Sequence, residues 1–184
     1  LAYSFSGPNL RAAGVDYDVR VMNPYASYQD FEFEIPVGTN GDTYDRFMVR
    51  GEEMWQSLSI IRQAIEKLEK LDDKNTFHAD IPSFYLPPKE EVYNNMEALI
   101  YHFKIVMGET DVPKGEVYHC VEGGNGELGF YLVSDGGSTP YRCKFRSPNL
   151  SNLAAIPEIA VGAKIGELVA IMATIDLVIA DIDR

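Results

Sequence analysis

The fold of this 184-residue chain rests on residues 43–70, TYDRFMVRGEEMWQSLSIIRQAIEKLEK. Apolar residues recur in this stretch at the spacing that keeps them on one face of an α-helix: Phe47, Met54, Leu58, Ile61, Ile65 and Leu68. Asp42 or Thr43 supplies an oxygen that can cap the first turn. At 1.5 Å per residue the helix would be ~42 Å long. A helix of this length needs partner helices for its apolar face, so we predict a helical bundle.

The segments on either side of this helix differ in character. Residues 1–42 are predicted to be irregular because prolines and glycines punctuate them. Within them, YQDFEFEIP (residues 28–36) alternates acidic and aromatic side chains, which fits a half-buried strand or an extended segment laid on a partner. A second helix is predicted over residues 89–107, with Gly108 as its stop signal.

Residues 115–147 change to the period of β-strands. The short runs GEVYHCVE, GELGFYLVS and PYRCKFR are separated by the turn sequences GGNG and DGGST, which predicts a three-stranded antiparallel meander. In the last run Arg142, Lys144 and Arg146 fall on one face of the strand. This cationic face is either solvated and paired with neighbouring carboxylates or docked against an acidic partner surface.

Residues 148–184 are predicted to form a helical tail, with Pro157 at an early helical position and a possible break at Gly162 or Gly166. The fold class is therefore α+β, in four segments of one domain fragment: an irregular leading segment (1–42), part of a helical bundle (43–114), the meander (115–147) and the tail (148–184). The first residue is Leu1 rather than Met, so we expect a piece of a longer protein.

Composition narrows the classes of partner. The formal net charge of −12 disfavours nucleic acid and anionic lipid surfaces. Two cysteines, Cys120 and Cys143, do not make a disulfide framework, and the three histidines lack metal-ligand spacing, so no metal centre is predicted. The longest apolar run, Leu168–Ala180, is shorter than the roughly 20 residues of a membrane span.

The last ten residues, IDLVIADIDR, contain the one sequence pattern that suggests a functional site. No phosphate-binding glycine loop and no nucleophile motif is present. Asp176 stands inside an apolar run, where an ionised carboxylate is costly unless it is paired. It either caps a following turn or has a raised pKa in a dry cavity and exchanges protons there. Arg184 is the candidate counter-charge.

Four segments together resemble one known family: SGPNLRAAGVDYDVR (6–20), GDTYDRFMVRGEEMWQSLSIIRQAI (41–65), residues 113–149 with the meander, and IDLVIADIDR (175–184). The family is the 49-kDa subunit, also called the D subunit, of respiratory complex I, the proton-pumping NADH:quinone oxidoreductase. The resemblance runs from about Ser6 to Arg184 and covers only the carboxy-terminal half of the family. It implies the fold of the large subunit of nickel–iron hydrogenases, a distant relative.

Hydrogenases end in a DPCxxCxxH motif that binds their metal pair. Laid over this chain, Asp176 keeps the acid, Leu177 replaces the proline, and Val178 and Asp181 stand where the cysteines would be. No thiolate remains to hold nickel. The resemblance implies that the former metal cavity is a quinone chamber. Asp176 is then the candidate proton-coupling carboxylate, and the following residues line or support the chamber: Val178, Ile179, Asp181, Asp183 and Arg184.

The resemblance also sets expectations about the assembly. It implies quinone as the substrate of the complex, no cofactor in this chain, and an iron–sulfur cluster in the neighbouring B subunit. Partners would be the B, C and I subunits and the membrane-embedded H subunit, on the cytoplasmic side of the bacterial inner membrane or its mitochondrial equivalent. Docking would use the face of Arg142, Lys144 and Arg146. Two alternatives stay open: a purely structural docking module, and the equivalent subunit of a ferredoxin- or F420-dependent quinone reductase.

Overall fold

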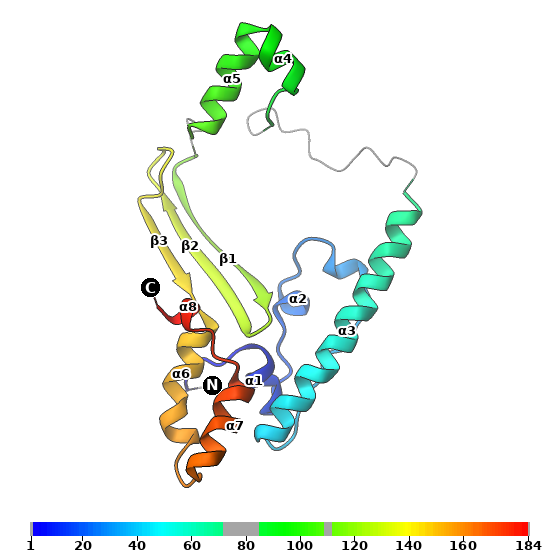
Figure 1. The fold of residues 1–184 in the computed structure, drawn as a ribbon, viewed down its shortest axis with the longest axis vertical. Helices are drawn as coiled ribbons and strands as arrows, with labels where there is room; N and C mark the ends of the chain where they lie inside the picture. The colour runs from blue at the N-terminus through cyan, green and yellow to red at the C-terminus, as the bar shows by residue number, and fades with distance from the viewer. Residues whose placement is uncertain (1, 72–84, 109–111, 184) are drawn as a thin grey trace. The chain divides into compact units, whose positions relative to one another are not determined.

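The structure, a computed structural model, describes residues 2–71, 85–108 and 112–183. It divides into two compact units (Figure 1). The first unit comprises Leu1–Lys70, His119–Phe130 and Phe145–Arg184, and the second comprises Leu71–Tyr118 and Tyr131–Lys144. Helices and a three-stranded sheet in the order β1-β2-β3 together confirm the α+β class.

The leading segment, residues 1–42, was predicted to be irregular, but it contains short helices. They are α1 (Gly7–Ala12), α2 (Val19–Met22) and the 3-10 helix η1 (Tyr28–Asp30). Pro8 lies in the first turn of α1, where its missing N–H costs no hydrogen bond, and the Asp18 side chain caps α2. Every residue of α1 is buried. Helices this short are marginal by themselves, so their surroundings stabilise them.

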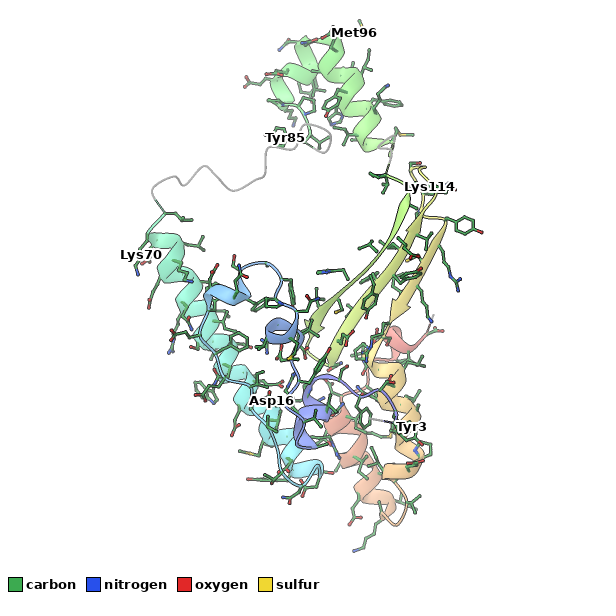
Figure 2. The ribbon with its side chains drawn as sticks, turned by 180° about the vertical axis from the view of Figure 1, so that it is seen from behind. Tyr3, Asp16, Lys70, Tyr85, Met96 and Lys114 are labelled. Carbon is green, nitrogen blue, oxygen red and sulfur yellow. The ribbon has the colours of Figure 1, made fainter. Side chains whose placement is uncertain are left out.

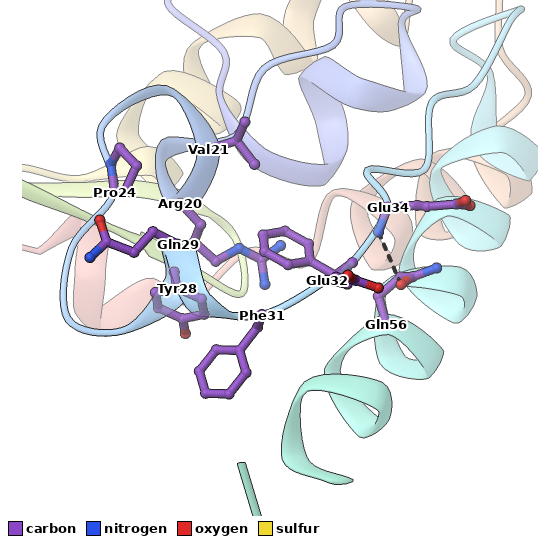
Figure 3. Close-up of a pocket in the computed structure, with 10 residues that line it drawn as sticks. Arg20, Val21, Pro24, Tyr28, Gln29, Phe31, Glu32, Glu34 and Gln56 are labelled. Atoms are coloured by element: carbon purple, nitrogen blue, oxygen red, sulfur yellow. Dashed lines mark hydrogen bonds between the residues drawn. The ribbon is translucent and has the colours of Figure 1, made fainter. Parts of the chain in front are cut away.

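The acidic–aromatic segment lies extended along α3 (Thr43–Glu69). The Gln63 side chain accepts from the Glu32 N–H at 2.9 Å and donates to the Glu32 carbonyl at 2.6 Å. The Glu34 N–H donates to Gln56 Oε1 at 3.1 Å (Figure 3). Phe31 and Phe33 are half-buried, whereas Glu32 and Glu34 are exposed. The segment therefore has the half-buried alternation of one predicted alternative, with glutamine side chains in place of a neighbouring strand.

Helix α3 confirms the prediction for residues 43–70, including its cap, because the Asp42 side chain accepts from the Asp45 N–H at 2.8 Å. Its first half packs against α1 and against α7 (Ile165–Ile175). The apolar stripe is exposed, from 44% at Leu58 to 66% at Phe47. Among the described residues, then, the expected bundle covers only the amino-terminal part of this helix.

The predicted meander is confirmed as β1 (Gly115–Gly123), β2 (Gly126–Ser134) and β3 (Arg142–Arg146). The turn between β1 and β2 lies directly against the start of α1. A Cβ placed on Gly7 would come within 2.3 Å of Gly126 Cα, and Gly7 also has a φ of +66°. Glycine at both positions is what lets the two backbones meet.

The predicted helix over residues 89–107 is interrupted. It forms α4 (Lys89–Asn94) and α5 (Met96–Val106), because Asn95 has an extended backbone. The Asn95 side chain accepts from the Glu97 N–H at 2.9 Å and so caps α5. Gly108, with a φ of +77°, follows the end of α5 as predicted. Two adjacent asparagines inside an apolar periodicity, Asn94 and Asn95, were the only sign of this break.

The tail folds as α6 (Pro148–Ile159), α7 and α8 (Ile179–Ile182). The prediction for Pro157 was wrong: Pro148 takes the early position behind the Ser147 cap, and Pro157 lies near the end of α6. Gly162, with a φ of +86°, provides the break before α7. Helix α6 packs against α7 and α8. Tyr3, which is labelled in Figure 2, lies beside α6, and its hydroxyl donates to Glu158 on that helix.

Candidate functional site

A groove of about 740 Å³ in the first unit runs along α3. Its wall is largely apolar, and the β1–β2 turn and the residue that ends α7 also contribute to its lining. Charged side chains line it as well: Arg50, Glu53 and Asp176. The remaining lining residues are Phe47, Gly51, Met54, Ser57, Leu58, Ile61, Gly124 and Asn125. An apolar wall with a few polar groups is typical of sites for amphipathic small molecules.

Asp176 ends α7 in the left-handed conformation, with a φ of 59° and a ψ of 62°. Aspartate tolerates this region better than most residues, although glycine is the usual residue at such a helix end. Its backbone N–H donates to the Met172 carbonyl at 3.2 Å, and its side chain is exposed. Asp176 thus ends the preceding helix through its backbone rather than capping a following turn, and its carboxylate lines the groove.

Arg50 joins α3 to the end of α7. Its guanidinium donates to the Thr174 carbonyl and, at 3.1 Å, to the Ile175 carbonyl. These carbonyls belong to the last turn of α7, where helix carbonyls lack partners and a cation is favoured. Burial lowers the pKa of Arg50 from its ordinary value, and the charge of Asp176 opposes the shift. Since arginine is not deprotonated in proteins, the groove contains a fixed positive charge.

Glu53 lies one turn further along α3. It lines the groove and also belongs to a buried ionic network. Its Oε1 accepts from Arg11 Nε at 2.7 Å and lies 2.6 Å from Arg11 Nη2. Arg11 Nη1 donates to Glu122 Oε1 on β1 at 2.9 Å and reaches Asp18 at 3.4 Å. Asp18 is in turn held by Arg20 at 2.7 and 3.0 Å. We refer to Arg11, Asp18, Arg20, Glu53 and Glu122 as the buried network.

The carboxyl groups of the buried network have different pKa shifts. Burial raises the pKa of Glu53 and of Glu122, and the charge of Arg11 offsets only part of each shift. Burial also acts to raise the pKa of Asp18, but the hydrogen bond and charge of Arg20 outweigh it, so that pKa is lowered. Asp18 is therefore the carboxyl group that stays ionised most readily. Glu53 and Glu122 hold a proton more readily than ordinary glutamates do.

The other predicted chamber residues lie elsewhere or are exposed. Asp181 accepts from the Ser147 hydroxyl at 2.5 Å and from the Asn149 side chain at 2.9 Å, which fixes the start of α6. Val178 and Ile179 are 44% and 77% exposed in this chain. Asp183 is exposed, and Arg184 lies outside the described residues.

The three cations of β3 have different environments. Arg146 is half-buried and donates to the Ser6 hydroxyl at 3.0 Å, the Ser4 carbonyl at 3.0 Å and the Glu127 carbonyl at 2.6 Å. Arg142 and Lys144 are exposed. Arg146 therefore uses its guanidinium within the chain, and docking through this strand stays a prediction that concerns Arg142 and Lys144 most directly.

Apart from Asp176, sequence reasoning missed the charged residues that the groove and the buried network bring together. Arg50 did leave a signal, because it lies three residues after Phe47 and four before Met54, on the same helical stripe. A cationic side chain on an apolar helical stripe is expected to bind a partner in the protein interior. Arg11 and Glu122 left no such signal, since 111 residues separate them in the chain.

The described residues contain neither a candidate metal site nor a candidate membrane-spanning helix. In those residues, no cluster of three or more histidine, cysteine, aspartate or glutamate side chains has the arrangement of a metal site. None of the helices that the structure describes combines the length and apolar character needed to cross a bilayer.

Comparison with known proteins identifies similar chains. The family profile described as respiratory-chain NADH dehydrogenase, 49 Kd subunit, matches residues 1–184. The chain is 66% identical over 183 residues to the NADH-quinone oxidoreductase D subunit 2 of Cytophaga hutchinsonii, an alignment that covers 100% of this chain and 46% of that relative. It is 60% identical over 183 residues to the NADH-quinone oxidoreductase D subunit of Flavobacterium psychrophilum, covering 100% and 44%. The chain thus spans about half the length of the curated relatives it matches.

Proposed function

Because this chain belongs to the 49-kDa subunit family of the respiratory-chain NADH dehydrogenase, we propose that its groove forms part of a quinone-binding chamber. The reaction would be that of a proton-pumping NADH:quinone oxidoreductase, in which an iron–sulfur cluster of a neighbouring subunit delivers electrons to quinone. The chain itself would bind no redox cofactor. Its place would be the peripheral arm, beside the B, C and I subunits and the membrane-embedded H subunit.

The amphipathic character of the groove is the observation that carries this proposal. A quinone has a polar ring with two carbonyl oxygens and an apolar isoprenoid tail. The exposed apolar residues of α3 offer a wall for the tail, and Arg50 and Glu53 place a cation and a carboxyl at the same groove. A cation stabilises the negative charge that develops on a quinone oxygen as it is reduced.

Asp176 would act as a proton-coupling carboxylate in this chamber. It is ionisable and exposed in the groove, and its charge acts directly on Arg50. A change in its protonation would therefore alter the field at the cation that faces the quinone. Asp181 would support the chamber indirectly, by fixing α6 through Ser147 and Asn149. Val178, Ile179, Asp183 and Arg184 would line or support the chamber in the assembled protein.

Asp176→Asn in the assembled oxidoreductase tests the proposal, with Asp16→Asn at an exposed loop position as the matched control. We expect NADH:quinone activity to fall at least tenfold. NADH oxidation by an artificial acceptor that bypasses quinone should be unchanged, and an unchanged amount of this chain in the purified complex reports normal assembly. A purely structural docking module, the alternative function, predicts equal quinone activity in the two variants.

A further inference from the structure

We propose that Glu53 is a catalytic residue of the groove, which carries a proton on Oε2 and hands it to an oxygen of the reduced quinone. The inference rests on the proposed quinone function and adds a specific proton donor to it. Arg11 is the corresponding positioning residue, because it holds the other carboxyl oxygen in place.

The two oxygens of Glu53 have different surroundings. Oε1 receives both Arg11 contacts, Nε at 2.7 Å and Nη2 at 2.6 Å. Among the described residues none donates a hydrogen bond to Oε2. The side chain is 17% exposed and lines the groove, whereas Glu122 is 4% exposed and is not among the lining residues. Glu53 is therefore the carboxyl through which the buried network meets a ligand in the groove.

Charge balance favours one stored proton. The buried network contains two arginines, Arg11 and Arg20, and three carboxyl groups, so full ionisation leaves one net negative charge. Arg50 and Asp176 beside it balance each other. A buried net charge is costly, and a single proton on one carboxyl removes it. Asp18 is tied to Arg20 by two hydrogen bonds, which leaves Glu53 and Glu122 as the candidates.

Hydrogen bonding decides between these two candidates. Glu122 accepts from Arg11 at 2.9 Å through Oε1 and from the Val19 N–H at 3.1 Å through Oε2, so donors occupy both of its oxygens. A carboxylate that accepts at both oxygens is stabilised in its ionised form. Glu53 has donors at one oxygen only, and burial raises its pKa. The proton therefore resides on Glu53.

The proposed step is a single proton transfer. The O–H bond at Glu53 Oε2 breaks, and a new O–H bond forms at a quinone oxygen made basic by electrons from the iron–sulfur cluster. The resulting carboxylate stays paired with Arg11. The charged groups around it, which set the pH range of the step, come from every neighbouring element: Arg11 on α1, Asp18 before α2, Arg20 on α2, Arg50 on α3, Glu122 on β1 and Asp176 after α7.

The test compares Glu53→Gln with Glu52→Gln in the assembled oxidoreductase, since Glu52 is the adjacent exposed residue. For Glu53→Gln we expect kcat for quinone reduction to fall at least tenfold and its pH dependence to lose one ionisation, with KM for quinone changed less than threefold. Glu53→Asp should recover part of kcat with a shifted pH profile. NADH oxidation by an artificial acceptor should match the wild type in every variant.

Labelling with a photoreactive short-chain ubiquinone analogue tests quinone binding in the groove separately from proton donation by Glu53. If it labels residues 47–61 and Glu53→Gln behaves like Glu52→Gln, the groove binds quinone and Glu53 is not the donor. If quinone does not compete for labelling of these residues, the proposed function itself fails. Competed labelling together with the loss of kcat and of one ionisation in Glu53→Gln supports both.

Discussion

Helix α1 and the second half of α3 reverse the usual relation between polarity and burial. The sequence of α1, GPNLRA, contains an asparagine and an arginine, yet all six residues are buried. The second half of α3 carries an apolar stripe, yet Leu58, Ile61, Ile65 and Leu68 are 44–62% exposed. Burial in this chain thus depends on whether a partner is available as much as on hydrophobicity.

The polar residues of α1 can be buried because each has specific partners. Arg11 contacts three carboxyl groups and the Tyr17 carbonyl, and Asn9 donates to the Ile175 carbonyl at 3.4 Å. A buried charge is tolerated when it is paired with opposite charges and hydrogen-bonded in this way. The stripe of α3 has no such covering among the described residues, and continuous exposed apolar surface is typical of interfaces. This agrees with the proposed place in a multi-subunit assembly.

Removing the charge of Arg11 should give the largest effect. Arg11→Met keeps the volume of the side chain but leaves the carboxylates around it without their shared cation. We expect the free energy of unfolding to fall by about 3–5 kcal/mol, the cost of breaking a buried ion pair. Guanidinium unfolding of the purified chain, followed by far-UV circular dichroism, measures it. Arg62→Met, at an exposed position of α3, is the control, and equal midpoints for the two variants would contradict the comparison.

A matched pair of isoleucines tests the contrast by size alone. Ile175 is 1% exposed and Ile65 is 51% exposed. Ile175→Ala should destabilise the chain by about 2–5 kcal/mol, because it leaves a cavity in the core. Ile65→Ala should change stability by less than about 0.5 kcal/mol. Thermal unfolding of both variants measures the two losses of stability. A large loss of stability in Ile65→Ala would mean that the apolar stripe of α3 is covered in solution.

A pair of glycines tests the contact between α1 and the β1–β2 turn. Gly7→Ala should cost about 1–3 kcal/mol, the usual range for backbone strain, because its φ is +66° and its Cβ would meet Gly126. Gly51→Ala, inside α3 with no atom within 4 Å of the added Cβ, should instead stabilise the chain by up to about 1 kcal/mol. Opposite signs in a urea titration are the expected result. Shifts of the same sign would show that one of these two environments is wrong.

The smallest effect concerns pH, because the carboxyls of the buried network act in opposite directions. The lowered pKa of Asp18 gives stability that is present above its ordinary value of 3.8 and lost as pH falls. The raised pKa of Glu122 gives the reverse: its contribution is present below 4.5 and is lost as pH rises through the folded-state pKa. From pH 4.5 upward, the wild type should therefore lose stability relative to Glu122→Gln.

Denaturant unfolding of the wild type and Glu122→Gln at several pH values from 4.5 to 8 measures this difference. The quantity that matters is the slope of the stability difference against pH, since the absolute difference also includes the lost contact with Arg11. A slope of zero would show that Glu122 has the same proton affinity in the folded and unfolded chain.

Several elements could be predicted from the sequence because their signals are local. Helix α3 follows from a cap at Asp42 and a regular apolar period, and the meander follows from two glycine-rich turns. Asp176 could be singled out because an acid in an apolar run is visible in the sequence. The break at Asn95 and the short helix α1 could not be predicted, since each depends on a side-chain cap or on surroundings that propensity does not record.

The sequence by itself determined the α+β class, the limits of the longest helix, the order of the strands and the family to which the chain belongs. Only the tertiary structure decided that Glu53, 42 residues from Arg11, shares that cation with Glu122, 111 residues away. It also decided that Asp176 and Arg50 face one groove. The physical reason is range: caps, periods and turns act over a few residues, whereas the energy of a charge depends on whichever groups the folded chain brings within a few ångströms.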